Sequence, residues 1–154
     1  MIERFGSNRG QAIIEFAFIL PIMLILVVGI IEFGVIYYDQ AMLTNASREG
    51  ARVAVEYRGK DGGGACIQVS QSEIDTAVND YLAGKLIDFG GDATWQVLPA
   101  VRTAGDSPDC MSTGGTVQRV TVRVQYQHGY LVLPNFLGLG NTINLGAETT
   151  MERL

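Results

Sequence analysis

A long apolar run near the N-terminus constrains the fold of this chain more than any other feature. Residues 16–31 carry no charge, and the run extends to residue 38 with Glu32 as its only charged residue. As a helix, the segment 16–38 would be about 35 Å long, more than the roughly 30 Å hydrocarbon core of a bilayer. The remaining chain is too short to bury such a helix on all sides, which disfavours a core helix. A cleaved secretory signal would be shorter and would end in a small-residue site, so we predict a membrane anchor.

The charged residues exclude several functional classes. The chain has a net charge of −5 and only 11 Lys and Arg residues among 154, which argues against nucleic acid as a partner. His128 is the single histidine, so a multi-histidine metal site is excluded. No nucleophile–base pair or metal-ligand cluster is visible in the sequence. We therefore predict a protein that is not an enzyme, with no catalytic residue, no metal and no cofactor.

An acidic residue stands at the start of the apolar run, where an ionisable group is costly and indicates function. If the chain were cut after Gly10, Gln11 would gain an α-amino group with a reference pKa of about 7.7–8.0. Glu15 lies four residues further on and could pair with that charge in its own helix or in a neighbouring one. Pairing between subunits would favour one register, because a slipped neighbour leaves unpaired charges. Alternatively, Glu15 marks the membrane boundary and reaches the headgroups.

These residues carry a resemblance to a known family. A short basic leader ending in Arg9-Gly10, followed by Gln11, Glu15 and Phe16, resembles the processing signature of type IV prepilins. Residues 9–56 as a whole resemble the TadE-like family, the minor pseudopilins of the tight-adherence (Flp-type) pilus system. The further matching elements are Pro21, Glu32-Phe33-Gly34 and the run Asn45-Ala46-Ser47-Arg48-Glu49-Gly50-Ala51-Arg52.

The resemblance implies cleavage by a prepilin peptidase between Gly10 and Gln11, and assembly into a thin adhesive type IVb (Flp/Tad) pilus. It implies as partners the major Flp-type pilin, other minor pseudopilins, the inner-membrane assembly platform and membrane lipid. We expect a single-pass inner-membrane protein with its C-terminal domain in the periplasm, available for incorporation into a surface pilus. The positive residues on either side of the run do not decide this orientation. The alternative is an uncleaved, membrane-anchored periplasmic scaffold or binding protein.

We expect three regions: a leader (1–10), one long helix (11–57, with its membrane part at about 12–38) and an extracytoplasmic domain (58–154). Pro21 should bend the helix, either as a functional point of local melting or as a passive kink. Glu32 lies about 25 Å along the axis from Glu15, near the opposite interface. We expect its carboxylate to reach the headgroups there; the alternative is pairing with a basic residue of another subunit. Beyond residue 38, small residues permit close packing of the helix on the domain; they are Ala46, Gly50, Ala51 and Ala54.

The domain is predicted to be α+β, with a small antiparallel sheet packed against the long helix. Ser70 and Glu73 form a capping box that opens a short helix. A strand is expected around 94–101, where Pro99 indicates a sheet edge. Strict alternation predicts a strand at 119–128, with His128 on its apolar face as a buried structural residue, and a last strand lies near 142–152. The strand order cannot be read from the sequence.

Two cysteines, Cys66 and Cys110, lie in expected loops after the membrane segment. If that side of the membrane is oxidising, a disulfide between them is plausible. Two free thiols are the alternative.

Overall fold

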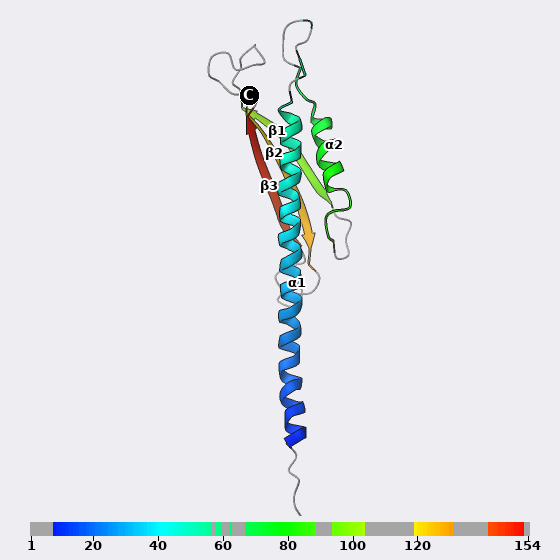
Figure 1. The fold of residues 1–154 in the computed structure, drawn as a ribbon, viewed down its shortest axis with the longest axis vertical. Helices are drawn as coiled ribbons and strands as arrows, with labels where there is room; N and C mark the ends of the chain where they lie inside the picture. Colours follow the sequence, from blue (N-terminus) through cyan, green and yellow to red (C-terminus); the bar gives the residue numbers. More distant parts are fainter. Residues whose placement is uncertain are drawn as a thin grey trace, which may run out of the picture.

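The computed structural model describes residues 8–56, 58–59, 62, 67–88, 94–103, 119–130 and 142–152. Two helices and three strands follow in the order α1 (Asn8–Ala54), α2 (Gln71–Leu82), β1 (Trp95–Thr103), β2 (Arg119–Gly129) and β3 (Thr142–Glu152). Figure 1 shows the C-terminal half of α1 against the sheet and its N-terminal half extending away from the domain. The predicted α+β architecture, a long apolar helix with a short helix and an antiparallel sheet, is confirmed.

Helix α1 is continuous over 47 residues and contains Pro21 in its interior. It begins at Asn8, so it includes the last three residues of the expected leader, and it ends three residues before the expected boundary at 57. Proline lacks the N–H that would bond to the preceding turn, and a membrane helix tolerates this loss better than a soluble one. The bend at Pro21 stays a prediction.

The three strands form an antiparallel sheet in the order β1-β2-β3, which the sequence left open. Strand β2 is central, and its alternation places five side chains on the buried face: Val120, Val122, Val124, Tyr126 and His128. Strand β1 lies at an edge, and its pairing with β2 shifts register between Leu98 and Val101, a segment that includes Pro99. Proline cannot donate to a sheet hydrogen bond, which explains its position at an edge irregularity.

Close packing of α1 on the rest of the domain depends on small residues. Ala46, Ala51 and Ala54 are buried, as expected. At Gly50, an added Cβ would lie 2.7 Å from Val78 Cγ2 and 3.2 Å from Val122 Cγ1, so a larger residue would collide with both α2 and β2. The absence of a side chain at this position therefore sets how closely α1 approaches its two neighbours.

Polar contacts fix the same half of α1 along β3. Gln40 Nε2 donates to the carbonyl oxygen of Gly146 at 2.8 Å, and the hydroxyls of Ser47 and Thr149 lie 2.7 Å apart. Ser47 is fully buried, so its hydroxyl needs such partners. These bonds set the position of the helix along the strand, which apolar packing alone does not specify.

Helix α2 begins with the predicted capping box. Ser70 accepts from the Glu73 N–H through its side chain, while the Glu73 carboxylate accepts from the Ser70 N–H at 2.9 Å. Ile74, Val78 and Leu82 form its buried stripe. Because β1 also bonds to the start of this helix, through Ala100 N–H to Gln71 Oε1 at 2.9 Å, α2 and α1 cover one face of the sheet.

Candidate functional site

The first half of α1 is a candidate interaction surface, because it is apolar and uncovered. Every residue from 12 to 27 is exposed, and among the large apolar side chains of this stretch Phe18 (75%) and Ile13 (69%) are the most exposed. The helix is long and apolar enough to cross a membrane. A soluble domain rarely leaves so large a continuous apolar surface uncovered, so this segment requires lipid or other protein around it.

Coverage of α1 becomes one-sided before the apolar run ends. Gly29 is buried and Glu32 is only 2% exposed, whereas Ile30, Phe33 and Tyr37 on the other side of the helix remain 65–80% exposed. The expectation that Glu32 presents its carboxylate at the surface was therefore wrong. Sequence reasoning placed this residue at the membrane boundary, because the sequence does not indicate which part of the chain covers this segment of α1.

The processing and pairing residues lie at the free end of α1. Gly10 and Gln11 are both helical, and Gln11 Nε2 donates to Glu15 Oε1 at 3.1 Å. All three residues are exposed. The structure thus brings Gln11 and Glu15 together one turn apart, as the helical spacing predicts, and the carboxylate faces the surroundings rather than the domain.

A buried polar pair joins α1 to β2 on the domain side of the exposed stretch. His128 Nδ1 lies 3.0 Å from Asp39 Oδ2, and both side chains are fully buried. Asp39 Oδ1 also accepts from the backbone N–H of Ile87 at 3.1 Å. Burial raises the pKa of the Asp39 carboxyl, and the Ile87 N–H and the imidazole oppose this rise. The pair ties three parts of the chain together: α1, the end of β2 and the segment after α2.

Two tyrosine rings enclose the imidazole of His128. Tyr126 and Tyr130 meet it edge-on, with ring centroids 5.9 and 6.3 Å away. Burial, assisted by the nearby negative charges of Asp88 and Asp39, raises the pKa of Tyr126 to about 12. Since His128 is fully buried, solvent and substrate do not reach the imidazole, and the geometry fits a structural residue.

Sequence reasoning placed His128 correctly but missed its partner. Asp39 directly follows the apolar run, and the sequence reasoning assigned it no role. A usable signal was present, because Glu32, Asp39, Leu43, Ala46 and Gly50 recur at spacings of seven, four, three and four. These spacings place all five on one helical face.

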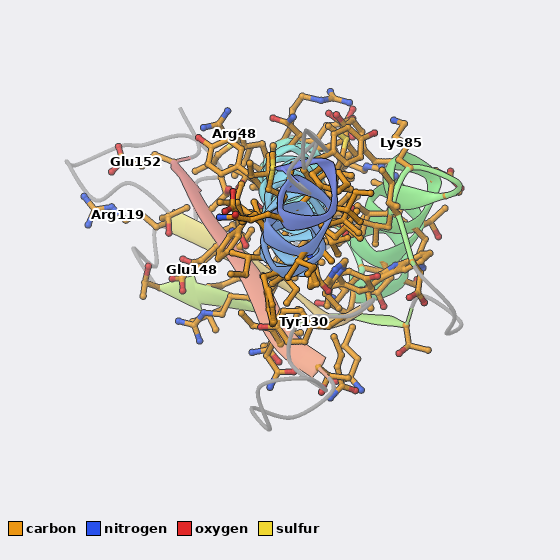
Figure 2. The ribbon with its side chains drawn as sticks, turned by 90° about the horizontal axis from the view of Figure 1, so that it is seen from below. Arg48, Lys85, Arg119, Tyr130, Glu148 and Glu152 are labelled. Atoms are coloured by element: carbon orange, nitrogen blue, oxygen red, sulfur yellow. The ribbon has the colours of Figure 1, made fainter. Side chains whose placement is uncertain are left out.

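The face of the sheet opposite the helices is polar. Cross-strand ion pairs join Arg119 to Glu152 at 2.7 Å and Arg123 to Glu148 at 2.8 Å. Figure 2, a view along α1, shows Arg119, Glu148 and Glu152 directed away from the helices. The four side chains are 45–60% exposed, so each pair contributes little to stability, and the described residues leave this face accessible to solvent.

Several predicted positions lie outside the described residues. They are the leader up to residue 7 and both cysteines, Cys66 and Cys110, so their pairing stays a prediction. Within the described ranges, no group of three or more His, Cys, Asp or Glu residues is arranged to hold a metal ion.

Comparison with known proteins identifies the segment that bears these features. Residues 10–52 match the family model described as TadE-like protein. No curated protein and no solved structure matches the chain. The matched residues include the exposed apolar stretch, Glu15 and Asp39. The resemblance seen in the sequence is therefore confirmed for this segment: residues 10–52, which form most of α1, are similar to the TadE-like family.

Proposed function

We propose that the protein is a pilin-like minor subunit for assembly of a thin adhesive type IVb (Flp/Tad) pilus, and that it is processed after Gly10. The observation that carries this proposal is the uncovered apolar half of α1, with Glu15 near its free end, in a segment that matches the TadE-like family. The activity is assembly rather than catalysis. The helix inserts in the membrane and then packs among the helices of other subunits.

Helix packing is supported by the composition of the exposed stretch. Between residues 12 and 31, α1 exposes branched aliphatic and aromatic side chains and, apart from Glu15, no charge. In lipid such a helix gains no hydrophobic energy by meeting another helix, so specificity must come from side-chain packing and from polar groups. Glu15 is the polar group in this stretch that can select a partner and a register.

Processing is supported by the local structure around Gly10. A peptidase needs an extended scissile segment, and Gly10 and Gln11 lie in the first turn of α1, where few backbone bonds must be broken. Glycine is about 1 kcal/mol less favourable than alanine within a helix, which eases this unwinding. Cleavage would leave an α-amino group on Gln11, whose side chain already contacts Glu15.

The proposal includes partners and a location. Prepilin peptidase would process the chain, and the inner-membrane assembly platform, the major Flp-type pilin and other minor pseudopilins would contact it. Membrane lipid would border residues of about 12–38, on all sides up to Val27 and on the exposed side of the helix beyond it, and the C-terminal domain would lie in the periplasm. There, an oxidising environment would permit a Cys66–Cys110 disulfide.

The N-terminus of the mature protein tests the processing step. Intact mass and N-terminal sequencing of the protein from cells that make the pilus should show a chain starting at Gln11. Gly10→Val should leave the unprocessed precursor, whereas Ser7→Ala, in the leader but away from the scissile bond, should be processed normally. Functional fibres that contain the chain with its leader attached would overturn the proposal and favour an uncleaved periplasmic scaffold.

Variants of Glu15 test the pairing step. Glu15→Val should enter the membrane, because it removes a costly charge, but pilus yield should fall. Glu15→Asp keeps the charge on a shorter side chain and should retain part of that yield. Membrane content by fractionation and pilus content by shearing measure the two steps separately, and a wild-type yield with Glu15→Val would contradict the pairing.

A further inference from the structure

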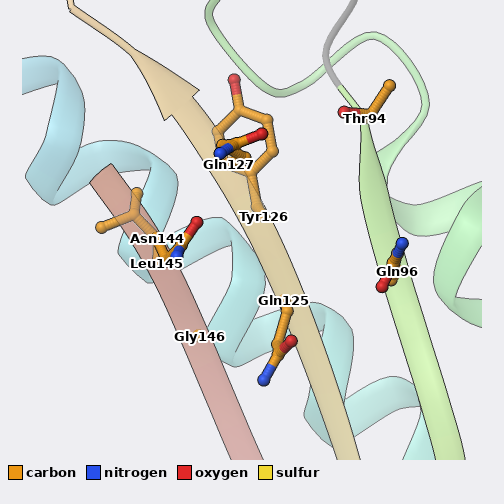
Figure 3. A pocket seen from close by; sticks show the side chains of 8 residues that line it. All are labelled: Thr94, Gln96, Gln125, Tyr126, Gln127, Asn144, Leu145 and Gly146. Carbon is orange, nitrogen blue, oxygen red and sulfur yellow. The ribbon is translucent and has the colours of Figure 1, made fainter. Parts of the chain in front are cut away.

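A groove crosses the outer face of the sheet, opposite the two helices. It is open on one side, has a volume of about 390 Å³ and is lined by residues of all three strands. Figure 3 shows the lining residues: Thr94, Gln96, Gln125, Tyr126, Gln127, Asn144, Leu145 and Gly146. A second hollow of about 230 Å³ shares Gln125 and Gly146 and is also lined by the paired side chains of Arg123 and Glu148. We call the larger hollow, whose lining carries no charged side chain, the amide groove.

The polar side chains of the amide groove are uncharged. Gln96, Gln125, Gln127 and Asn144 are exposed, and each amide offers one acceptor oxygen and two N–H donors. Tyr126 also borders the groove, but its side chain is buried on the helix side of the sheet. Gln127 Nε2 donates to Thr142 Oγ1 at 3.3 Å, a contact that orients this amide and leaves its oxygen for another donor. The groove therefore presents donors and acceptors side by side without a net charge.

A glycine keeps the centre of the groove open. Gly146 is the direct partner of Gln125 across the β2–β3 pair. A Cβ added there would meet Val124 O at 3.7 Å and Gln125 Cγ at 4.0 Å, which are ordinary contact distances. Gly146 does not have a positive φ, so its backbone accepts any L-residue. Neither steric crowding nor the backbone conformation requires glycine at position 146. Its missing side chain leaves open space between the side-chain amides that line the groove.

We propose that the amide groove binds a neutral oligosaccharide. Vicinal hydroxyls both donate and accept, as do planar amides, so sugar and groove match in chemistry and in their lack of charge. An anion is disfavoured, because none of the described residues that line the larger hollow is cationic and Arg123 beside it is paired. A β-strand peptide is disfavoured, because strand addition needs a sheet edge and the groove lies over the sheet face. This inference does not depend on the proposed pilus role.

Binding can be measured on the full chain in a zwitterionic detergent that has no sugar headgroup. The probes are neutral hexasaccharides of glucose and of N-acetylglucosamine, with a sulfated hexasaccharide and a neutral polar peptide for comparison. Side-chain NH₂ resonances of Gln96, Gln125, Gln127 and Asn144 report occupancy of the groove. We expect saturable shifts with at least one neutral sugar and a weak affinity, because the described lining residues expose no aromatic ring for stacking.

Gly146→Leu supplies the decisive variant, since its side chain would fill the groove beside Gln125 without backbone strain. We expect at least a tenfold loss of sugar affinity. Thr150→Leu adds the same side chain to the same face of β3 outside the groove and should bind as the wild type does. Thermal unfolding checks that both variants fold, and Gln125→Ala replaces Gly146→Leu if the latter does not. Absence of any shift with the neutral sugars, shifts only with the sulfated sugar or the peptide, or full affinity in the groove-filling variant would overturn the proposal.

Discussion

Asp39 and His128 meet inside the protein, with Oδ2 and Nδ1 3.0 Å apart and neither side chain exposed. Asp39 belongs to the helix that leaves the domain, and His128 lies near the end of the central strand. A buried polar pair of this kind gives little net stability over an apolar pair. Its effect is positional: only one rotation and one height of α1 on the sheet bring the two groups together.

Removing one member of this pair should destabilise the domain. Asp39→Ala leaves His128 buried without its carboxylate and the Ile87 N–H without its acceptor, so we expect a loss of roughly 3–5 kcal/mol. The matched control is Glu148→Ala, which breaks the exposed pair with Arg123 and should cost at most about 1 kcal/mol. Chemical unfolding of the full chain in detergent measures both. Equal losses in the two variants would contradict the role given to Asp39.

The buried hydroxyl of Tyr126 should produce an alkaline limit of stability. Burial raises its pKa from 10.0 to about 12, so the folded state holds this proton where the unfolded chain releases it. The associated stability is complete below pH 10 and is lost as the pH rises toward 12. Tyr126→Phe should remove this part of the alkaline slope.

At neutral pH the same variant should be as stable as the wild type or more so. The Tyr126 hydroxyl has no hydrogen-bond partner among the described residues, and removing an unsatisfied buried group costs nothing. Unfolding free energies at neutral and alkaline pH provide the comparison. An unchanged alkaline slope in Tyr126→Phe would show that other groups cause it.

The capping box of α2 should give an acid-dependent contribution. Hydrogen bonds from the Ser70 N–H and hydroxyl lower the pKa of Glu73, and Arg58 at 2.6 Å assists. A lowered pKa means that this stabilisation is present above the ordinary value of 4.5 and is lost as the pH falls through the folded-state value. Glu73→Gln should therefore flatten the acid limb of the stability curve.

The other half of the cap provides a check at neutral pH. Ser70→Ala removes the acceptor for the first turn of α2 and should cost about 1 kcal/mol there. Because it also removes the hydroxyl bond to Glu73 but leaves the Ser70 N–H and Arg58, it should weaken the acid slope only in part. Unfolding curves of both variants between neutral and acidic pH separate the two effects. A Glu73→Gln protein with the wild-type acid slope would place the titrating group elsewhere.

Two glycines of α1 should respond in opposite directions to the same change. At Gly50, the Cβ of alanine would collide with Val78 and Val122, at a cost of roughly 1–3 kcal/mol. Over most of its range this cost exceeds the gain of about 1 kcal/mol that alanine has over glycine in a helix, so we expect a net loss of stability. At Gly34, nothing lies within 4 Å, so alanine should leave the domain at least as stable. Thermal unfolding compares the two, and equal midpoints would show that Gly50 does not set the packing distance.

Local patterns in the sequence predicted the elements of the domain well. Alternation over 119–128 identified β2 and its buried face, because strand side chains alternate strictly between two environments. Ser70 and Glu73 located the start of α2 through bonds that close within four residues. The apolar run identified α1 as a helix able to cross a membrane, since its length and composition alone support that conclusion.

Relations between distant segments could not be predicted in the same way. The pairing of Asp39 with His128 joins residues far apart in the chain, and alternation shows which face His128 occupies but not what lies opposite. The strand order could not be predicted for the same reason, because the pattern of each strand is compatible with a central or an edge position. Glu32 was misjudged since its burial depends on coverage by residues distant in sequence. The amide groove was not predicted, because polar residues in a strand normally indicate only a solvent-exposed face of the sheet.

Between Gly29 and Tyr37, one side of α1 is covered by the rest of the chain and the opposite side is exposed. In this segment another helix can contact α1 only on the exposed side, which carries Phe33 and Tyr37, because the rest of the chain covers the other side. From residue 12 to residue 27 the helix is exposed on all sides. In the assembly proposed above, such helices would therefore pack closely near the N-terminus, while each domain would lie on one side of its own helix.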